Sequence, residues 1–239
     1  MTNSKKILSL NNVEVGYGSK VILKNVSFDL FEGEILALIG QNGSGKSTLL
    51  KSIYGLISHK HGEIFFNDGA IHNIHAYKLR NIGLSYFIQN GLVMPNLTVD
   101  EHINLSMNGR SSIIDFDYNK IVNDAFPKLK NFGSHRAGNL SGGERQMLSL
   151  AMLMLQETKT WFLDEPTAGL APEMVKFTGE FLQKKNYEDN ITMLLVEHNL
   201  DVAFKLATSV IVVKNGGITD KFTRDEFLSK DFLEEIVYK

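Results

Sequence analysis

Hydrophobic residues near the start of the chain alternate with polar ones, which is the pattern of strands with one buried face. The apolar positions are Ile7, Leu8, Leu10, Val13, Val15, Val26, Phe28 and Leu30. The alternation stops at residues 35–39, where Ile-Leu-Ala-Leu-Ile contains no polar residue. Such a run is typical of a strand buried on both faces. We therefore predict antiparallel strands followed by one fully buried strand.

Beyond a glycine-rich turn, the apolar residues recur at helical spacing. They are Leu49, Leu50, Ile53, Leu56 and Ile57. Later apolar runs at residues 161–163, 193–196 and 210–213 alternate with helical stretches. Alternating strands and helices indicate a parallel sheet flanked by helices. The fold class is therefore α/β, with an antiparallel β subdomain on its N-terminal side.

Two capping boxes predict where further helices begin, because each places Thr three residues before Glu. One is Thr98-Val-Asp-Glu101, which opens a stretch of helical patterning that continues to about Phe132. The other is Thr223-Arg-Asp-Glu226, which opens an amphipathic helix at the end of the chain.

The helical stretch in the middle of the chain contains no strong strand pattern, so we predict that it forms an inserted subdomain. We expect a helical lobe over about residues 91–139 and an α/β core formed by residues 1–90 and 140–239. Together they would make a single domain over residues 1–239.

Net charge, apolar runs and cysteine content limit the kinds of partner and cellular compartment that we expect for this chain. A net charge of −2 gives no reason to expect a nucleic-acid partner or a polybasic membrane anchor. The longest nearly apolar run, Met147–Leu155, falls far short of the roughly 20 residues that span a bilayer. Met1–Lys6 is polar and basic, with no signal-peptide core behind it, and the chain lacks cysteine. We expect a cytoplasmic protein.

The glycine-rich turn runs from Gly40 to Thr48 and matches the phosphate-binding pattern G-x-x-x-x-G-K-[ST] between a strand and a helix. Glycines let backbone N–H groups approach phosphate oxygens, and the helix points its positive end at the same place. The candidate phosphate ligands are Gly40, Asn42, Gly43, Ser44, Gly45, Lys46, Ser47 and Thr48. Lys46 would reach the β- and γ-phosphates, and the Ser47 hydroxyl would bind Mg²⁺. This motif alone fits a kinase, a GTPase or a motor equally well.

A second candidate motif consists of two acidic residues that follow the apolar run at residues 161–163. Asp164 suits Mg²⁺, which prefers carboxylate and water oxygens. Glu165, one residue further, can polarise a water that attacks the γ-phosphate. The alternative is a pair of solvated acids at a strand end.

The motif Leu140-Ser-Gly-Gly-Glu144 distinguishes among the phosphate-binding classes. Together with Lys46, Asp164-Glu165 and His198 in this order, it resembles the nucleotide-binding subunit of ABC transporters. The resemblance implies a P-loop NTPase core, ATP and Mg²⁺ as ligands, and ATP hydrolysis. It also implies that Ser141, Gly142 and Gly143 bind the γ-phosphate of ATP held by a second subunit. The same residues form a plain capping box, and both interpretations can hold.

Three more residues take roles from this resemblance. Tyr17 matches the aromatic residue that stacks on adenine in this family. Gln89 matches the glutamine that senses Mg²⁺ and the attacking water, and His198 matches the histidine that contacts the γ-phosphate. The expected catalytic residues are thus Glu165, His198 and Gln89. The expected metal-binding residues are Ser47, Gln89 and Asp164. Each could instead be an ordinary strand-end or loop residue.

The chain also departs from the family pattern. Ala171 stands where the loop that links the two ATP sites usually carries aspartate. The Ala171-Pro172 form is similar to subunits of branched-chain amino-acid importers and of some lipid-related exporters.

The resemblance implies transmembrane subunits and a second nucleotide-binding subunit, identical or related, as partners on the cytosolic face of a membrane. The alternatives are a soluble ABC ATPase acting on a ribosome, DNA or another assembly, and a nucleotide-binding regulator without turnover. DNA-repair relatives insert long coiled coils, whereas only about 50 residues separate Gln89 from Leu140 here. The presence of Glu165 and His198 argues against a regulator without turnover.

Overall fold

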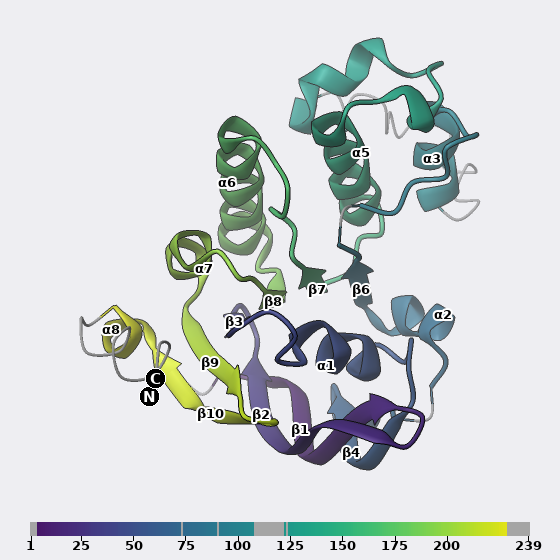
Figure 1. The fold of residues 1–239 in the computed structure, drawn as a ribbon. Coiled ribbons are helices and arrows are strands. Elements are labelled where there is room, and N and C mark those ends of the chain that lie inside the picture. The colour runs from purple at the N-terminus through teal and green to yellow at the C-terminus, as the bar shows by residue number, and fades with distance from the viewer. Residues whose placement is uncertain (1–3, 73, 90, 108–121, 123, 229–239) are drawn as a thin grey trace.

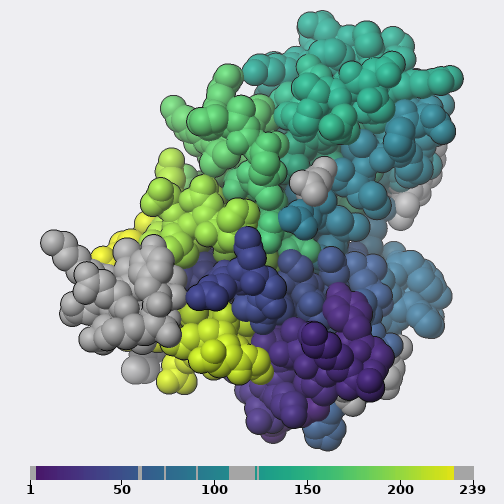
Figure 2. Space-filling model, viewed as in Figure 1, coloured from purple at the N-terminus to yellow at the C-terminus, as the bar shows by residue number. Residues whose placement is uncertain are grey.

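The computed structural model describes residues 4–72, 74–89, 91–107, 122 and 124–228. A four-stranded and a six-stranded sheet lie in the lower half of Figure 1, and a lobe of helices stands above them. Figure 2 shows the same arrangement in space-filling form, with the teal lobe above the sheet residues.

The smaller sheet is antiparallel and has the order β2-β1-β4-β5. Its strands are β1 (Lys6–Tyr17), β2 (Lys20–Phe31), β4 (His59–Phe66) and β5 (Gly69–Ala70). The predicted antiparallel strands are confirmed, and their alternating apolar residues are buried. Asn12 has a left-handed backbone (φ 49°), and the register shifts between Leu10 and Val13 around it. Strands β4 and β5 were not predicted.

The larger sheet has the order β10-β9-β3-β8-β7-β6, and only β10 runs antiparallel to its neighbour. Its strands are β3 (Ile35–Ile39), β6 (Leu84–Phe87), β7 (Thr160–Asp164), β8 (Thr192–Val196), β9 (Ser209–Lys214) and β10 (Gly217–Thr223). All five residues of β3 are buried, as predicted for a strand covered on both faces. The predicted strands at residues 161–163, 193–196 and 210–213 are confirmed, whereas β6 and β10 were missed.

Helices lie on both faces of the larger sheet and in the lobe above it. They are α1 (Lys46–Ile53), α2 (Ala76–Leu79), α3 (Val99–Ser106), α5 (Gly142–Met154), α6 (Pro172–Asp189), α7 (Leu200–Leu206) and α8 (Arg224–Phe227), with 3₁₀ turns at Arg80–Ile82, Pro127–Asn131 and Ala137–Asn139. Helix α1 packs between the two sheets, and α5 and α6 pack on the other side of the larger one. Because these strands are parallel, one edge of the sheet carries the carboxyl ends of β3, β6, β7 and β8. The start of α1 lies at this edge.

The two capping boxes are confirmed, at Thr98 for α3 and at Thr223 for α8. The predicted continuation of the first helix to Ile57 is wrong, because α1 ends at Ile53 and Gly55 turns into the left-handed region (φ 69°). Part of the central helical stretch (108–121 and 123) and the end of the last predicted helix (229–239) lie outside the described residues. Within the described ranges, no helix has both the length and the apolar character needed to cross a bilayer.

Candidate functional site

The loop between β3 and α1 depends on glycine at three positions. Gly40, Gly43 and Gly45 have φ angles of 145°, 78° and 105°, which side chains rarely allow. A Cβ atom at Gly40 would lie 2.3 Å from the Val213 carbonyl oxygen. At Gly43, by contrast, a Cβ atom would meet nothing within 4 Å, so the tip of the loop has open space in front of it.

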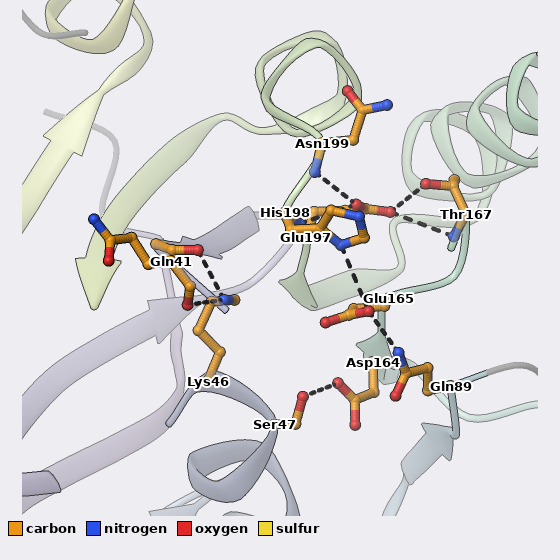
Figure 3. A network of polar contacts seen from close by, with 11 residues as sticks. Gln41, Lys46, Ser47, Gln89, Asp164, Glu165, Thr167, Glu197, His198 and Asn199 are labelled. Atoms are coloured by element: carbon orange, nitrogen blue, oxygen red, sulfur yellow. Dashed lines mark hydrogen bonds and ion pairs between the residues drawn. The ribbon is translucent and has the colours of Figure 1, made fainter. Parts of the chain in front are cut away.

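Lys46 begins α1 and is almost completely buried (4% exposed). Its Nζ atom donates to the carbonyl oxygens of Gly40 and Gln41, at 2.8 and 3.0 Å. Burial lowers the pKa of Lys46, whereas the charges of Glu165 and Asp164 act in the opposite direction. The ammonium group therefore lies between the loop and the carboxylates at the end of β7 (Figure 3).

Among the other loop residues, Ser44 has a buried hydroxyl with no hydrogen-bond partner in the described part of the chain. A buried hydroxyl of this kind suits an additional acceptor such as a phosphate oxygen. Asn42 is exposed at the loop surface, and Thr48 is half-buried in the first turn of α1.

Ser47 and Asp164 come together across α1 and β7. The Ser47 hydroxyl donates to Oδ1 of the fully buried Asp164 at 2.6 Å, and the Tyr86 hydroxyl donates to Oδ2 at 2.8 Å. A hydroxyl and a carboxylate are hard oxygen ligands, so this pair fits Mg²⁺ bound together with phosphate oxygens and waters. The described residues contain no group of three or more His, Cys, Asp or Glu side chains that could hold a metal by themselves.

Glu165 is the point where the three expected catalytic residues meet (Figure 3). Its Oε2 atom accepts a hydrogen bond from Gln89 Nε2 at 2.6 Å and lies 3.5 Å from His198 Nδ1. The residue has a positive φ of 49°, and a non-glycine residue in this region stores strain. Gln89 follows β6, Glu165 follows β7 and His198 follows β8, so three neighbouring strands deliver the three side chains.

Glu197 is a site residue that the sequence analysis missed. It is fully buried and accepts hydrogen bonds from Thr167 and from the backbone N–H groups of His198 and Asn199, at 3.2 and 3.3 Å. The carboxylate therefore ties the loop after Glu165 to the loop that carries His198. An acidic residue directly after the apolar strand β8 was the available signal.

Tyr17 ends β1 and pairs with Lys20 at the start of β2, and its side chain is 51% exposed. The adjacent residues Lys20–Ile22 line a cavity of about 430 Å³ together with Gly40–Ser44 and Val212–Gly216. The predicted adenine-stacking residue is therefore exposed and pairs with a residue that lines the same cavity as the phosphate loop.

Ser141 caps the N-terminus of α5, where its hydroxyl and the Glu144 carboxylate form a reciprocal capping box. Ser141 and Gly142 are exposed, and Gly143 packs beside Met174 in the first turn of α6. Figure 1 shows that α5 stands above the sheets, whereas α1 lies between them. The structure therefore does not bring Ser141, Gly142 and Gly143 to the phosphate loop of the same chain.

Comparison with known proteins agrees with this site. A family model described as ABC transporter matches residues 23–168. A probable branched-chain amino acid transport ATP-binding protein of Archaeoglobus fulgidus is 34% identical, over 94% of this chain and 95% of its own. A high-affinity branched-chain amino acid transport ATP-binding protein of Pseudomonas aeruginosa is 35% identical, and the match covers 89% of this chain and 91% of that protein.

Among solved structures, a dimeric ATP-binding cassette in a post-hydrolysis state with ADP and Pi superposes with a TM-score of 0.79 and 26% identity. The match covers 91% of this chain and 99% of that one. The chain therefore belongs to the ABC transporter family, as an ATP-binding subunit that hydrolyses ATP.

Proposed function

We propose that this chain binds ATP and Mg²⁺ in a site shared by two subunits, and that its hydrolysis of ATP drives separate transmembrane subunits. The observation that carries the proposal is the convergence of Gln89 and His198 on one oxygen of Glu165. This carboxylate lies next to Asp164 and within the electrostatic reach of Lys46. A carboxylate oriented from two sides at this position suits a general base.

ATP binding divides among neighbouring elements. The loop from Gly40 to Gly45 would surround the phosphates with backbone N–H groups, and Lys46 would exchange its carbonyl partners for phosphate oxygens. Tyr17 would stack on adenine. Ser47, Asp164 and Gln89 would hold Mg²⁺, which when bound neutralises charge on the β- and γ-phosphates.

Hydrolysis needs a base, an orienting group and a contact to the transferred phosphate. Glu165 would polarise the attacking water, and Gln89 would fix the carboxylate and the water together. His198 is 43% exposed, so its ring can reach a γ-phosphate while it stays close to Glu165. Glu197 would hold the His198 loop in place.

The second subunit would complete this site. Ser141, Gly142 and Gly143 form the accessible N-terminus of a 13-residue helix, which favours an anion. Because they lie away from their own phosphate loop, we assign them to ATP bound by the other copy or by a related sister subunit. The dimeric architecture of the post-hydrolysis cassette supports this assignment.

The helical lobe would make contact with the transmembrane subunits. We keep the boundaries expected from the sequence, a lobe over about residues 91–139 inserted into a core of residues 1–90 and 140–239. Gln89 stands at the junction of the two, next to Glu165, so a movement of the lobe would reach the site of hydrolysis. The complex would place this chain on the cytosolic face of a membrane, without nucleic acid as a partner.

The transported substrate we propose is a branched-chain amino acid, taken up into the cell. Both similar proteins described above are named as branched-chain amino acid transport ATP-binding proteins. Ala171-Pro172, noted in the sequence for its similarity to such subunits, points the same way.

The test is purification of the complex from solubilised membranes with this chain as bait. Transmembrane subunits should co-purify, and proteoliposomes made from the complex should accumulate leucine only with ATP. Glu165→Gln should leave the complex assembled but stop both hydrolysis and uptake. Co-purification with ribosomes or nucleic acid instead of membrane proteins would contradict the transport role and favour a soluble ABC ATPase.

A further inference from the structure

Tyr86 is a residue of the site whose hydroxyl has no role in the account above. It belongs to β6, and its hydroxyl donates to Asp164 Oδ2 at 2.8 Å. Ser47 donates to the other oxygen, Oδ1, at 2.6 Å. The two oxygens of one fully buried carboxylate are therefore held by two different elements, β6 and α1.

The Tyr86 ring is held from several directions. Its centroid lies 5.0 Å from that of Tyr54, which follows α1, and Tyr54 in turn meets Phe162 edge-on at 6.3 Å. Tyr86 pairs with Phe162 in the parallel ladder between β6 and β7, and Asp164 lies two residues further along β7. The ladder and the ring contacts fix the hydroxyl relative to the carboxylate.

The direction of this hydrogen bond follows from the chemistry of the two groups. A phenol hydroxyl has one proton to donate, whereas an ionised carboxylate has only acceptor oxygens. The Tyr86 hydroxyl is therefore the donor to Asp164 Oδ2, at 2.8 Å.

A carboxylate held at one oxygen binds a cation differently from a free one. A free carboxylate can rotate and present either oxygen, so metal binding must first restrict it. With Oδ2 engaged by Tyr86, Oδ1 stays directed towards Ser47, the other residue that we assign to Mg²⁺. Outer hydrogen-bond partners of metal ligands commonly change metal affinity by roughly 10–100-fold.

We propose that Tyr86 is a positioning residue for Mg²⁺, which orients the Asp164 carboxylate before the metal–ATP complex binds. This inference rests on the proposed function, because it takes Asp164 as the metal-binding carboxylate. It also explains why a tyrosine hydroxyl is directed at a fully buried acid of the site.

The test is Tyr86→Phe, which keeps the ring and removes only the hydroxyl. Mn²⁺ can replace Mg²⁺ as a spectroscopic probe, and its affinity for the protein with a non-hydrolysable ATP analogue is read by electron paramagnetic resonance. We expect the Mn²⁺ affinity to fall roughly 10–100-fold. ATP affinity in the presence of a metal chelator should stay at the wild-type level, which also verifies that the variant is folded.

Two further variants make the outcome decisive. Tyr54→Phe removes a hydroxyl from the neighbouring ring and should leave the Mn²⁺ affinity unchanged. Asp164→Asn should weaken Mn²⁺ binding strongly. If Asp164→Asn weakens Mn²⁺ binding and Tyr86→Phe does not, the Tyr86 inference is overturned and the metal assignment stands. If neither Asp164→Asn nor Tyr86→Phe has an effect, the metal assignment fails and the inference falls with it.

Discussion

Lys46 is a buried cation whose ammonium group donates to two carbonyl oxygens of its own loop. The residue therefore organises the loop, and in the function that we propose it would also supply charge for the phosphates. We expect Lys46→Ala to reduce ATP turnover roughly 10²–10³-fold and to weaken nucleotide binding, because one charge and several donors leave the β/γ-phosphate site.

Steady-state ATPase assays and calorimetric titration with ATP measure both effects. Lys51→Ala, in the same helix but outside the proposed site, is the matched control and should behave like the wild type. Near-normal turnover of Lys46→Ala would refute the assignment of the phosphate loop.

Tyr17 is half-exposed and pairs with Lys20, which lines the same cavity as that loop. Tyr17→Ala should weaken ATP binding by roughly 1–2 kcal/mol through lost stacking on adenine, with a smaller effect on turnover at saturating ATP. Tyr17→Phe keeps the stacking ring and should retain the affinity. Equal ATP affinities for the wild type and Tyr17→Ala would return this residue to an ordinary strand-end tyrosine.

At this scale the sequence identified residues that belong to a local motif. Lys46, Asp164 and His198 each belong to a short motif that marks them. Glu197 directly follows an apolar run but matches no motif, and Tyr86 lies within a strand. The importance of these two residues comes from partners far away in the chain. Thr167 lies 30 positions from Glu197, and Asp164 lies 78 positions from Tyr86.

His102 shows how one side chain shapes an element. It is fully buried in α3, where its Nδ1 atom lies 2.7 Å from the Thr98 carbonyl oxygen. Its Nε2 atom accepts the Met94 N–H at 2.8 Å, so Nδ1 must be the donor. The ring thus holds the loop that leads from Gln89 to α3.

His102→Ala would leave the Met94 N–H without its acceptor. We expect the free energy of unfolding to fall by about 1–3 kcal/mol, measured by urea denaturation. His135→Ala, an exposed histidine of the same lobe, should change it little. A His102→Ala variant as stable as the wild type would show that this ring does not hold the loop.

Helix α6 begins with a weak cap. Ala171 occupies the N-cap with the extended backbone of that position (φ −62°, ψ 151°), but it has no side-chain acceptor. Ala171→Asp should therefore raise the free energy of unfolding by about 1 kcal/mol, seen as a higher midpoint in thermal or urea unfolding. Ala171→Leu offers no acceptor and should give no gain. If Asp and Leu at this position gave equal stability, the cap explanation would be wrong.

At the scale of elements, the predictions succeeded where burial is continuous. The apolar residues 35–39 make β3 recognisable because both faces of that strand are covered. Strand β4 begins with polar residues and β10 is only partly buried, so neither shows an alternating pattern. Helix α1 ends at Ile53, before the last residues of its apolar pattern, because Gly55 has a left-handed backbone and turns the chain.

The molecule as a whole separates two sets of groups that we assign to phosphate binding. The phosphate loop lies between the two sheets, and the Ser141 cap begins α5, which stands above them (Figure 1). Sequence order alone could not show this separation, because both motifs come from the same chain. A site that uses both sets requires two chains, and ATP would then be part of their interface.

The most direct test of this central claim is size-exclusion chromatography of Glu165→Gln with ATP, with ADP and without nucleotide. The amide keeps the size of the side chain but lacks basicity, so the chemical step should slow by roughly 10²–10⁴-fold while ATP still binds. The account predicts a shift to dimer only with ATP, reversed when Ser141→Arg is added. A variant that remains monomeric at saturating ATP, both alone and with any related subunit that co-purifies, would contradict it.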